Sequence, residues 1–200
     1  KFANANNQSA MNELMNSDNY TYNGATGSVR KFFSDQSDGK YKPDFDVVGP
    51  VTLNNNVAHY GKNDASGNDV LPGDMVVEAC SIANANYGVD FTQYDNDGDG
   101  EVDFVYIIYA GKGEADGGAD NTIWPHNWSL DAAYYYDNCN YAQNARRFDG
   151  KYINNYACSG ELNGESGART GIGTIAHEFG HVIGLPDLYD IDYGQNYDNE

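Results

Sequence analysis

The chain has 200 residues, with 30 acidic against 11 basic side chains and a formal net charge of −19. Its length suits one domain with a substantial core, and its 40% hydrophobic content is typical of a folded rather than a disordered chain. So acidic a chain is a poor partner for nucleic acid or an anionic membrane surface, because both are bound through lysine and arginine clusters, and no apolar run is long enough for membrane insertion.

Three helices are predicted in the first half of the chain, over residues 8–17, 28–36 and 72–88. Each segment repeats apolar residues at helical spacing, which is typical of a helix with one buried face. Ser28 is a suitable cap for the second helix, and Pro72 is a suitable first residue for the third. We expect the third helix, the longest, to pack against a sheet.

Runs of β-branched and aromatic residues predict four strand segments, over residues 45–48, 51–53, 102–109 and 153–157. The 102–109 run is strongly apolar, so we expect a central strand there. Residues 153–157 precede the site described below, and we expect them to form an edge strand that pairs with a substrate backbone.

Polar, glycine-bearing stretches are predicted to be loops, and they cover residues 54–69, 111–121 and 160–173. Residues 134–147 show no clear period and are interpreted as a loop or an edge strand. The aromatic segment 123–126 is a candidate wall of a cleft. No linker divides the chain into independent domains.

The main functional signal is His177-Glu178-Phe179-Gly180-His181, near the end of the chain. Residues four apart lie on one face of a helix, so His177 and His181 would point the same way and could hold one metal ion. Glu178 could then take a proton from a water molecule bound to that ion. This H-E-x-x-H pattern is that of zinc hydrolases, although a buried helix with two incidental histidines is the alternative.

Asp187 is the preferred third zinc ligand. Gly184 can adopt the left-handed conformation that ends a helix, and Pro186 prevents the helix from resuming, so the turn would carry Asp187 back toward the two histidines. The rival ligands are His59 and His126, but neither has a spacing that argues for it. The predicted zinc site therefore consists of His177, His181 and Asp187 with a water molecule.

The segment 177–190, H-E-F-G-H-V-I-G-L-P-D-L-Y-D, resembles the zinc signature of the immune-inhibitor-A family of secreted bacterial metallopeptidases. That family is metzincin-like, with an aspartate where most metzincins have a third histidine. The resemblance covers most of the chain, including residues 27–33, 45–53, 94–114 and 123–130. It implies a zinc-dependent endopeptidase that acts on protein or peptide substrates, with zinc on His177, His181 and Asp187 and with Glu178 as the catalytic base.

The resemblance also implies an α+β fold, in which helices back a twisted mixed sheet and one helix carries the active site. Residues 1–200 would form a single peptidase catalytic domain. A metzincin needs a methionine turn beneath its metal, but Met11, Met15 and Met75 all precede the zinc helix. The resemblance therefore implies truncation at both ends, with the C-terminal subdomain beyond Glu200. It further implies a secreted or cell-surface protein whose signal peptide is not in this fragment, and we expect a monomer.

A second metal site is predicted in the acidic segment D-N-D-G-D-G-E-V-D, residues 95–103. Acidic side chains at alternate positions around a glycine turn can converge on one cation, and calcium prefers such oxygen ligands. The segment is similar to the start of an EF-hand loop, but Tyr106 stands at the twelfth position in place of glutamate. An acidic turn without a metal is the alternative. The expected calcium ligands are the side chains of Asp95, Asp97, Asp99 and Asp103 and the carbonyl oxygen of Glu101.

Two other functions compete with the peptidase interpretation. The chain could be a non-catalytic binding module that keeps the fold, although an intact Glu178 beside both histidines argues against this. It could also be a surface domain in which structural calcium is the only metal. No oxyanion-stabilising group is identifiable, and Tyr189 and Tyr193 are only weakly supported candidates.

The chain has three cysteines, so at least one lacks a partner within it. Cys80 falls in an apolar helical pattern and is expected to be a buried thiol. Cys139 and Cys158 could pair, but the sequence does not decide this.

Overall fold

A computed structural model describes residues 1–164 and 166–187 of the chain. Its centre is a three-stranded mixed sheet with the strand order β1 (Val105–Lys112), β5 (Asn155–Leu162), β2 (His126–Ser129). β1 runs parallel to β5, and β2 runs antiparallel to it. A sheet of this kind covered by helices agrees with the predicted α+β class, whereas the metzincin-like part of that expectation stays a prediction.

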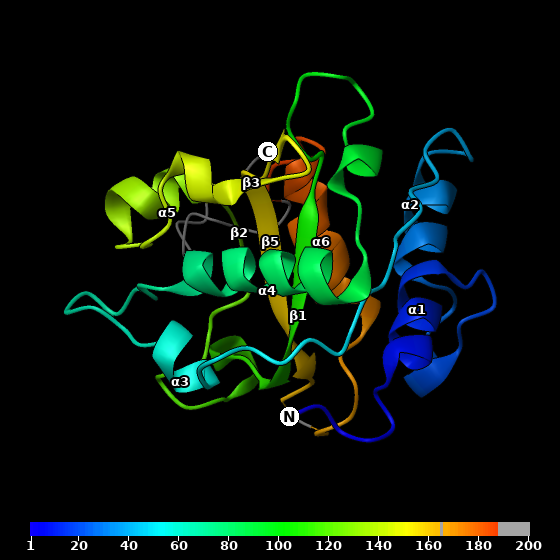
Figure 1. Ribbon diagram of the computed structural model, residues 1–200. Helices are drawn as coiled ribbons and strands as arrows, with labels where there is room; N and C mark the ends of the chain where they lie inside the picture. The colour runs from blue at the N-terminus through cyan, green and yellow to red at the C-terminus, as the bar shows by residue number, and fades with distance from the viewer. Residues whose placement is uncertain (165, 188–200) are drawn as a thin grey trace, which may run out of the picture.

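Helices cover both faces of this sheet (Figure 1). The longest, α4 (Pro72–Tyr87), crosses one face. On the other face lies α6 (Ile172–Val182), which carries the H-E-x-x-H sequence, with α1 (Gln8–Asn16) and α2 (Val29–Gln36) beside it. The four helices predicted from apolar periodicity are therefore all present.

Alternate residues of β1 explain why each face has its own helix. Successive side chains of a strand point to opposite faces. Tyr106 and Ile108 pack in the apolar cluster that contains the buried residues of α6, whereas Val105 and Ile107 pack in the cluster that contains the buried residues of α4. The site helix is thus held against one face of the sheet by a continuous core.

Caps fix the ends of the predicted helices. The side chain of Ser28 accepts a hydrogen bond from the backbone N–H of Lys31, as expected for a helix cap. Pro72 is the first residue of α4, and Gly88 ends that helix with φ of 69°, where it donates to the carbonyl of Ala83. These local signals explain why the helix positions could be predicted.

The remaining elements are short. The helical ones are η1 (Tyr22–Gly24), α3 (Val57–Tyr60), η2 (Phe91–Tyr94), η3 (Glu114–Asp116), α5 (Leu130–Tyr136) and η4 (Gln143–Arg146). A second sheet consists of β3 (Arg147–Phe148) and β4 (Lys151–Tyr152). The segments predicted as a loop at residues 54–69 and as a loop or edge strand at residues 134–147 therefore contain helical turns.

The strands predicted at residues 45–48 and 51–53 are wrong, because this segment is irregular. Side chains of α1 take the backbone groups that a neighbouring strand would use. The N–H of Phe45 donates to Asn16 Oδ1 at 3.0 Å, and the carbonyl of Phe45 accepts from Asn16 Nδ2 at 2.7 Å. The carbonyl of Val47 accepts from Gln8 Nε2 at 2.7 Å. Pro50, which has no N–H, further disfavours a sheet ladder here.

The middle strand of the described sheet is β5, not β1. All of residues 156–161 are buried, whereas most of β1 is half-buried. The prediction of a central strand at residues 102–109 and an edge strand at residues 153–157 is therefore wrong in both parts. β1 is apolar because helices cover both of its faces. Its apolar side chains do not indicate whether it has a neighbouring strand on each side. The antiparallel edge strand of the described sheet is β2.

The three cysteines are all buried thiols, so the structure contains no Cys139–Cys158 disulfide. Cys80 packs in the core between α4 and the sheet, as expected. Among the described helices, none combines the length and apolar character needed to cross a membrane.

Candidate metal centre

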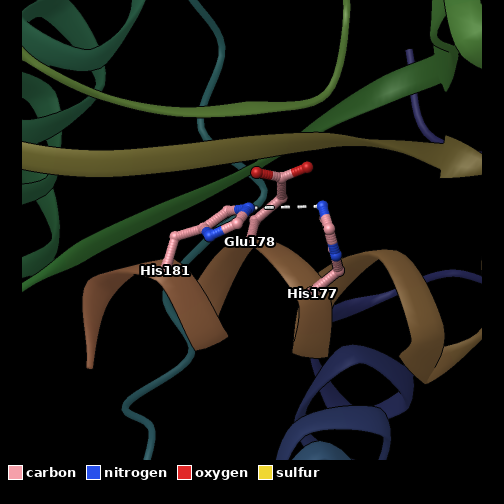
Figure 2. Close-up of side chains that lie close together, drawn as sticks. All are labelled: His177, Glu178 and His181. Atoms are coloured by element: carbon pink, nitrogen blue, oxygen red, sulfur yellow. Dashed lines mark hydrogen bonds between the residues drawn. The ribbon is translucent and has the colours of Figure 1, made fainter. Parts of the chain in front are cut away.

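His177 and His181 project from the same face of α6 (Figure 2). Their Nε2 atoms lie 3.3 Å apart, with the two rings tilted by 76°. The spacing of four residues produces this arrangement, because it brings side chains one helical turn apart onto one face. The helix therefore places two imidazole nitrogens side by side.

Asp187 reaches the same point after the helix has ended. Its Oδ1 lies 3.2 Å from Nε2 of His181 and 3.4 Å from Nε2 of His177. The turn is made by Gly184, whose φ is 85°, and the N–H of Leu185 donates to the carbonyl of Gly180 at 3.0 Å. The bend expected from the glycine thus brings the aspartate back to both histidines.

The three donor atoms form a nearly equilateral triangle with sides of 3.2, 3.3 and 3.4 Å. Donors about 2.0–2.1 Å from a tetrahedral zinc ion are separated by roughly 3.3 Å. Two imidazole nitrogens and a carboxylate oxygen are also donors that zinc accepts. Both the separations and the donor chemistry fit zinc.

A hydrogen bond fixes the tautomer of His181. Its Nδ1 lies 3.0 Å from the carbonyl oxygen of Leu185. A carbonyl only accepts, so Nδ1 must carry a proton, and in the neutral ring the lone pair is then on Nε2. The turn that delivers Asp187 therefore also directs His181 Nε2 toward the donor triangle.

Glu178 occupies a different environment from the three donors. It is 7% exposed, whereas the side chains of His177, Asp187 and His181 are 40%, 36% and 25% exposed. Its carboxylate points from α6 toward β5 (Figure 2). Burial raises the pKa of Glu178, the two histidines lower it, Asp187 raises it, and a hydrogen bond to the backbone of Asn127 lowers it. The site thus has an open side with three donors and a sheltered carboxylate next to them.

The rival histidines lie elsewhere. His126 is on β2, where Nδ1 lies 2.7 Å from the carbonyl of Trp124 and Nε2 lies 3.0 Å from the hydroxyl of Tyr156. His59 is exposed on α3 and contacts the ring of Tyr60. Neither joins the donor group. Tyr189 and Tyr193, the weak candidates for an oxyanion-stabilising group, lie outside the described residues.

The acidic loop gathers the carboxylates of three of its four expected side-chain ligands. Carboxylate oxygens of Asp95, Asp97 and Asp99 all lie within 4.8 Å of one another. Asp103 is not part of this group, and its carboxylate accepts from the backbone N–H and the side-chain amide of Asn96. The carbonyl oxygen of Glu101, the fifth expected ligand, stays a prediction. The calcium site stays a prediction, with the Asp103 side chain its least favourably placed member.

Sequence reasoning missed a lysine at this loop. Nζ of Lys151 lies 2.5 Å from Oδ2 of Asp95, and this contact is the largest of the causes that lower the pKa of Asp95. It also missed the backbone contact of Asn127 with Glu178. Both contacts depend on strand pairing between distant segments, so no local sequence signal indicates them.

Comparison with known proteins gives a consistent family assignment. The family described as "Immune inhibitor A peptidase M6, catalytic domain" matches residues 2–199. Immune inhibitor A of Bacillus thuringiensis subsp. alesti is 33% identical, over 83% of this chain and 26% of that protein. Pre-pro-metalloprotease PrtV of Vibrio cholerae serotype O1 (strain M66-2) is 29% identical, over 86% of this chain and 20% of that protein. The chain thus spans about a quarter or less of the length of these curated relatives.

Proposed function

Because the chain belongs to the immune inhibitor A (M6) family of metallopeptidases, we propose that it is the catalytic part of a zinc-dependent endopeptidase. The observation that carries this proposal is the triangle of donor atoms from His177, His181 and Asp187, with sides of 3.2–3.4 Å. Those three residues would hold the ion. When bound, zinc would lower the pKa of a coordinated water toward ~7 and polarise the scissile carbonyl.

Glu178 would act as the general base. Its carboxylate is adjacent to both imidazoles and sheltered from solvent, which favours proton transfer over competition by bulk water. Burial is the largest of the influences on its pKa, and it raises that pKa. After taking the proton of the attacking water, Glu178 would pass it to the leaving amine.

We also propose that β2, rather than β5, pairs with the substrate backbone. The N–H of Leu130 donates to the carbonyl of Asn154. In an antiparallel pair of strands, hydrogen-bonded and non-hydrogen-bonded residue pairs alternate, so every second residue pair is hydrogen-bonded like Leu130 and Asn154. Trp128 and His126 therefore direct their backbone groups toward β5. Asn127 and Ser129 direct theirs away from it, to the edge next to α6. The N–H of Asn127 is bound to Glu178, so the carbonyl of Asn127 and the backbone groups of Ser129 are the ones with which an extended peptide could pair.

The wider biology is proposed from the relatives. The Vibrio relative is named a pre-pro-metalloprotease. We propose that the present protein is secreted or at the cell surface, that its substrates are proteins or peptides, and that it acts as a monomer. The competing function is a non-catalytic, calcium-stabilised domain that keeps the peptidase fold. Retention of Glu178 between the histidines favours the enzyme.

The decisive variant is Glu178→Ala in the full-length protein. We expect zinc content to stay at the wild-type level while casein digestion falls by roughly 100-fold or more, because the base contributes to turnover and not to metal binding. Glu13→Ala, an exposed acid on α1, is the matched control and should digest casein normally. A chelator should abolish digestion by the wild type. Normal digestion by Glu178→Ala would refute the mechanism.

Structural calcium is the second proposal. Calcium would offset the repulsion among the Asp95, Asp97 and Asp99 carboxylates. We expect added calcium to raise the melting temperature of the wild type, but not that of an Asp97→Asn, Asp99→Asn double variant. Asp120→Asn, which removes one exposed acid elsewhere, should respond like the wild type. Equal responses of all three proteins would show that the loop binds no calcium.

A further inference from the structure

Two hydroxyl groups on the sheet face the site helix. In the register of β1 with β5, Tyr106 pairs with Ala157, and Ile108 pairs with Ser159. Tyr106 and Ile108 pack in the same apolar cluster as the buried residues of α6. Paired residues of neighbouring strands point to the same face of a sheet, so Ser159 also faces α6. The two hydroxyls therefore lie on the face that Glu178 meets.

The two hydroxyls interact with each other, but neither has a hydrogen bond of regular geometry to a described residue, and the outer proton of the pair has no acceptor among these residues. Both oxygen atoms are inaccessible to solvent, and Ser159 as a whole is 1% exposed. The tyrosines on the opposite face of the same strands differ, because Tyr109 donates to the carbonyl of Ile123 and Tyr156 bonds to His126. Unsatisfied buried hydroxyls destabilise a fold, so a pair of them under the site calls for an explanation.

Glu178 is a suitable hydrogen-bond acceptor for these two donors. Its carboxylate points from α6 toward β5 and is buried between helix and sheet (Figure 2). An ionised carboxylate has about four acceptor positions, and the backbone contact with Asn127 uses one of them. Burial raises the pKa of Tyr106 well above its usual range, Ser159 lowers it, and the charge of Glu178 raises it further. The Tyr106 hydroxyl therefore lies within electrostatic reach of the Glu178 carboxylate and of the Ser159 hydroxyl.

We propose that Tyr106 and Ser159 are positioning residues for the Glu178 carboxylate, an inference that rests on the proposed peptidase function. In this arrangement one carboxylate oxygen of Glu178 accepts a hydrogen bond from the hydroxyls. The hydroxyls of the sheet would hold that oxygen in place. The second carboxylate oxygen of Glu178 would face the two imidazoles, where the reacting water must bind. Tyr106 and Ser159 act through Glu178 and do not touch the substrate.

The kinetic test compares Tyr106→Phe and Ser159→Ala in the full-length protein. With a fluorogenic peptide substrate we expect each variant to lower kcat by roughly 10-fold and to leave KM unchanged, because a misdirected base slows proton transfer without altering substrate contacts. Tyr156→Phe is the matched control, since it removes a buried hydroxyl from the opposite face of the sheet. It should leave kcat unchanged.

A double-mutant cycle on unfolding gives a readout that does not depend on activity. In the presence of a chelator, Tyr106→Phe should lower the urea midpoint more in the wild type than in a Glu178→Ala background. Tyr156→Phe should lower it equally in both backgrounds. Equal shifts for Tyr106→Phe in the two backgrounds would overturn the inference. If the wild type had no peptidase activity, the proposed function would fail while this cycle would still decide the contact.

Discussion

His126 is a histidine whose burial favours its neutral form. Its Nδ1 faces a carbonyl oxygen, that of Trp124, and must donate, so its Nε2 is free to accept from the hydroxyl of Tyr156. Protonation would turn that acceptor into a donor. Burial lowers the pKa of His126, so the neutral ring is favoured in the folded state.

Because of His126, the free energy of unfolding should decrease as the pH is lowered. In the unfolded chain histidine binds a proton below about pH 6.5, whereas folded His126 binds it only at lower pH. Stability is present above the unfolded pKa and is lost as the pH falls toward the folded pKa. We expect His126→Gln to reduce the loss of unfolding free energy with falling pH, by at most about 1.4 kcal/mol per pH unit. Urea unfolding between about pH 5 and pH 8, with chelator, measures this.

His59→Gln serves as the control for that titration, because His59 is exposed on α3. It should keep the wild-type slope. If His126→Gln and the wild type lost stability at the same rate with falling pH, the neutral state of His126 would contribute nothing to the fold.

Single residues were predictable from the sequence where their neighbours are local. His177, Glu178 and His181 follow from helical spacing, and Asp187 follows from the glycine turn. Asn127, Tyr106 and Lys151 were not assigned to either site, because their contacts depend on how β1, β2 and β4 are placed against α6 and the acidic loop. Strand register is a property of long-range pairing, and no local pattern reports it.

Among the elements, α6 with its turn depends on one special backbone conformation. Gly184 has φ of 85°, which residues with a side chain rarely adopt. A Cβ atom at this position would meet nothing within 4 Å, so only the backbone strain opposes a substitution. The helix end and the position of Asp187 both follow from this glycine.

Gly184→Ala should therefore lower stability by about 1 kcal/mol and weaken zinc binding, because the turn would relax and displace Asp187. Competition against a chelating dye measures the affinity. Gly173→Ala, in the first turn of the same helix, also has free space around its Cβ but no positive φ. It should be neutral or stabilising by up to about 1 kcal/mol. Equal zinc affinities of the two variants would contradict this role of Gly184.

Elements were predictable where caps and periodicity agreed, as in α1, α2, α4 and α6. The segment at residues 45–53 misled because its apolar residues face the core while its backbone is bonded to side chains of α1. The positions of β1 and β5 in the sheet were mispredicted for a related reason. Hydrophobicity reports burial of side chains, whereas the place of a strand in a sheet depends on its backbone partners.

At the scale of the whole molecule, a buried polar network ties the N-terminal segment to the sheet and to the approach of α6. Asn6 bridges two buried charges, since its Nδ2 donates to Glu161 at 2.6 Å and its Oδ1 accepts from Arg169 at 2.9 Å. Glu161 also accepts from the backbone N–H groups of Ala3 and Gly111. The network thus joins segments that are more than 150 positions apart in the sequence.

Asn6→Ala should lower the free energy of unfolding by about 3 kcal/mol, because it leaves a buried carboxylate and a buried guanidinium each short of a partner. Asn12→Ala, on the exposed side of α1, should change it by less than about 0.5 kcal/mol. Urea unfolding of both variants makes the comparison. A loss for Asn6→Ala as small as that of the control would show that solvent replaces the lost bonds.

The donor triangle is built from a very short piece of chain, residues 177–187. Closing so short a ring costs little chain entropy, so this stretch could be transplanted as a cassette into an unrelated helical host. Asn127, Tyr106 and Ser159 would not travel with it, because they come from separate strands. A grafted cassette would carry the donor triangle and Glu178 but not the groups that shelter and position Glu178, so it should capture an ion and turn over substrate more slowly than the native domain.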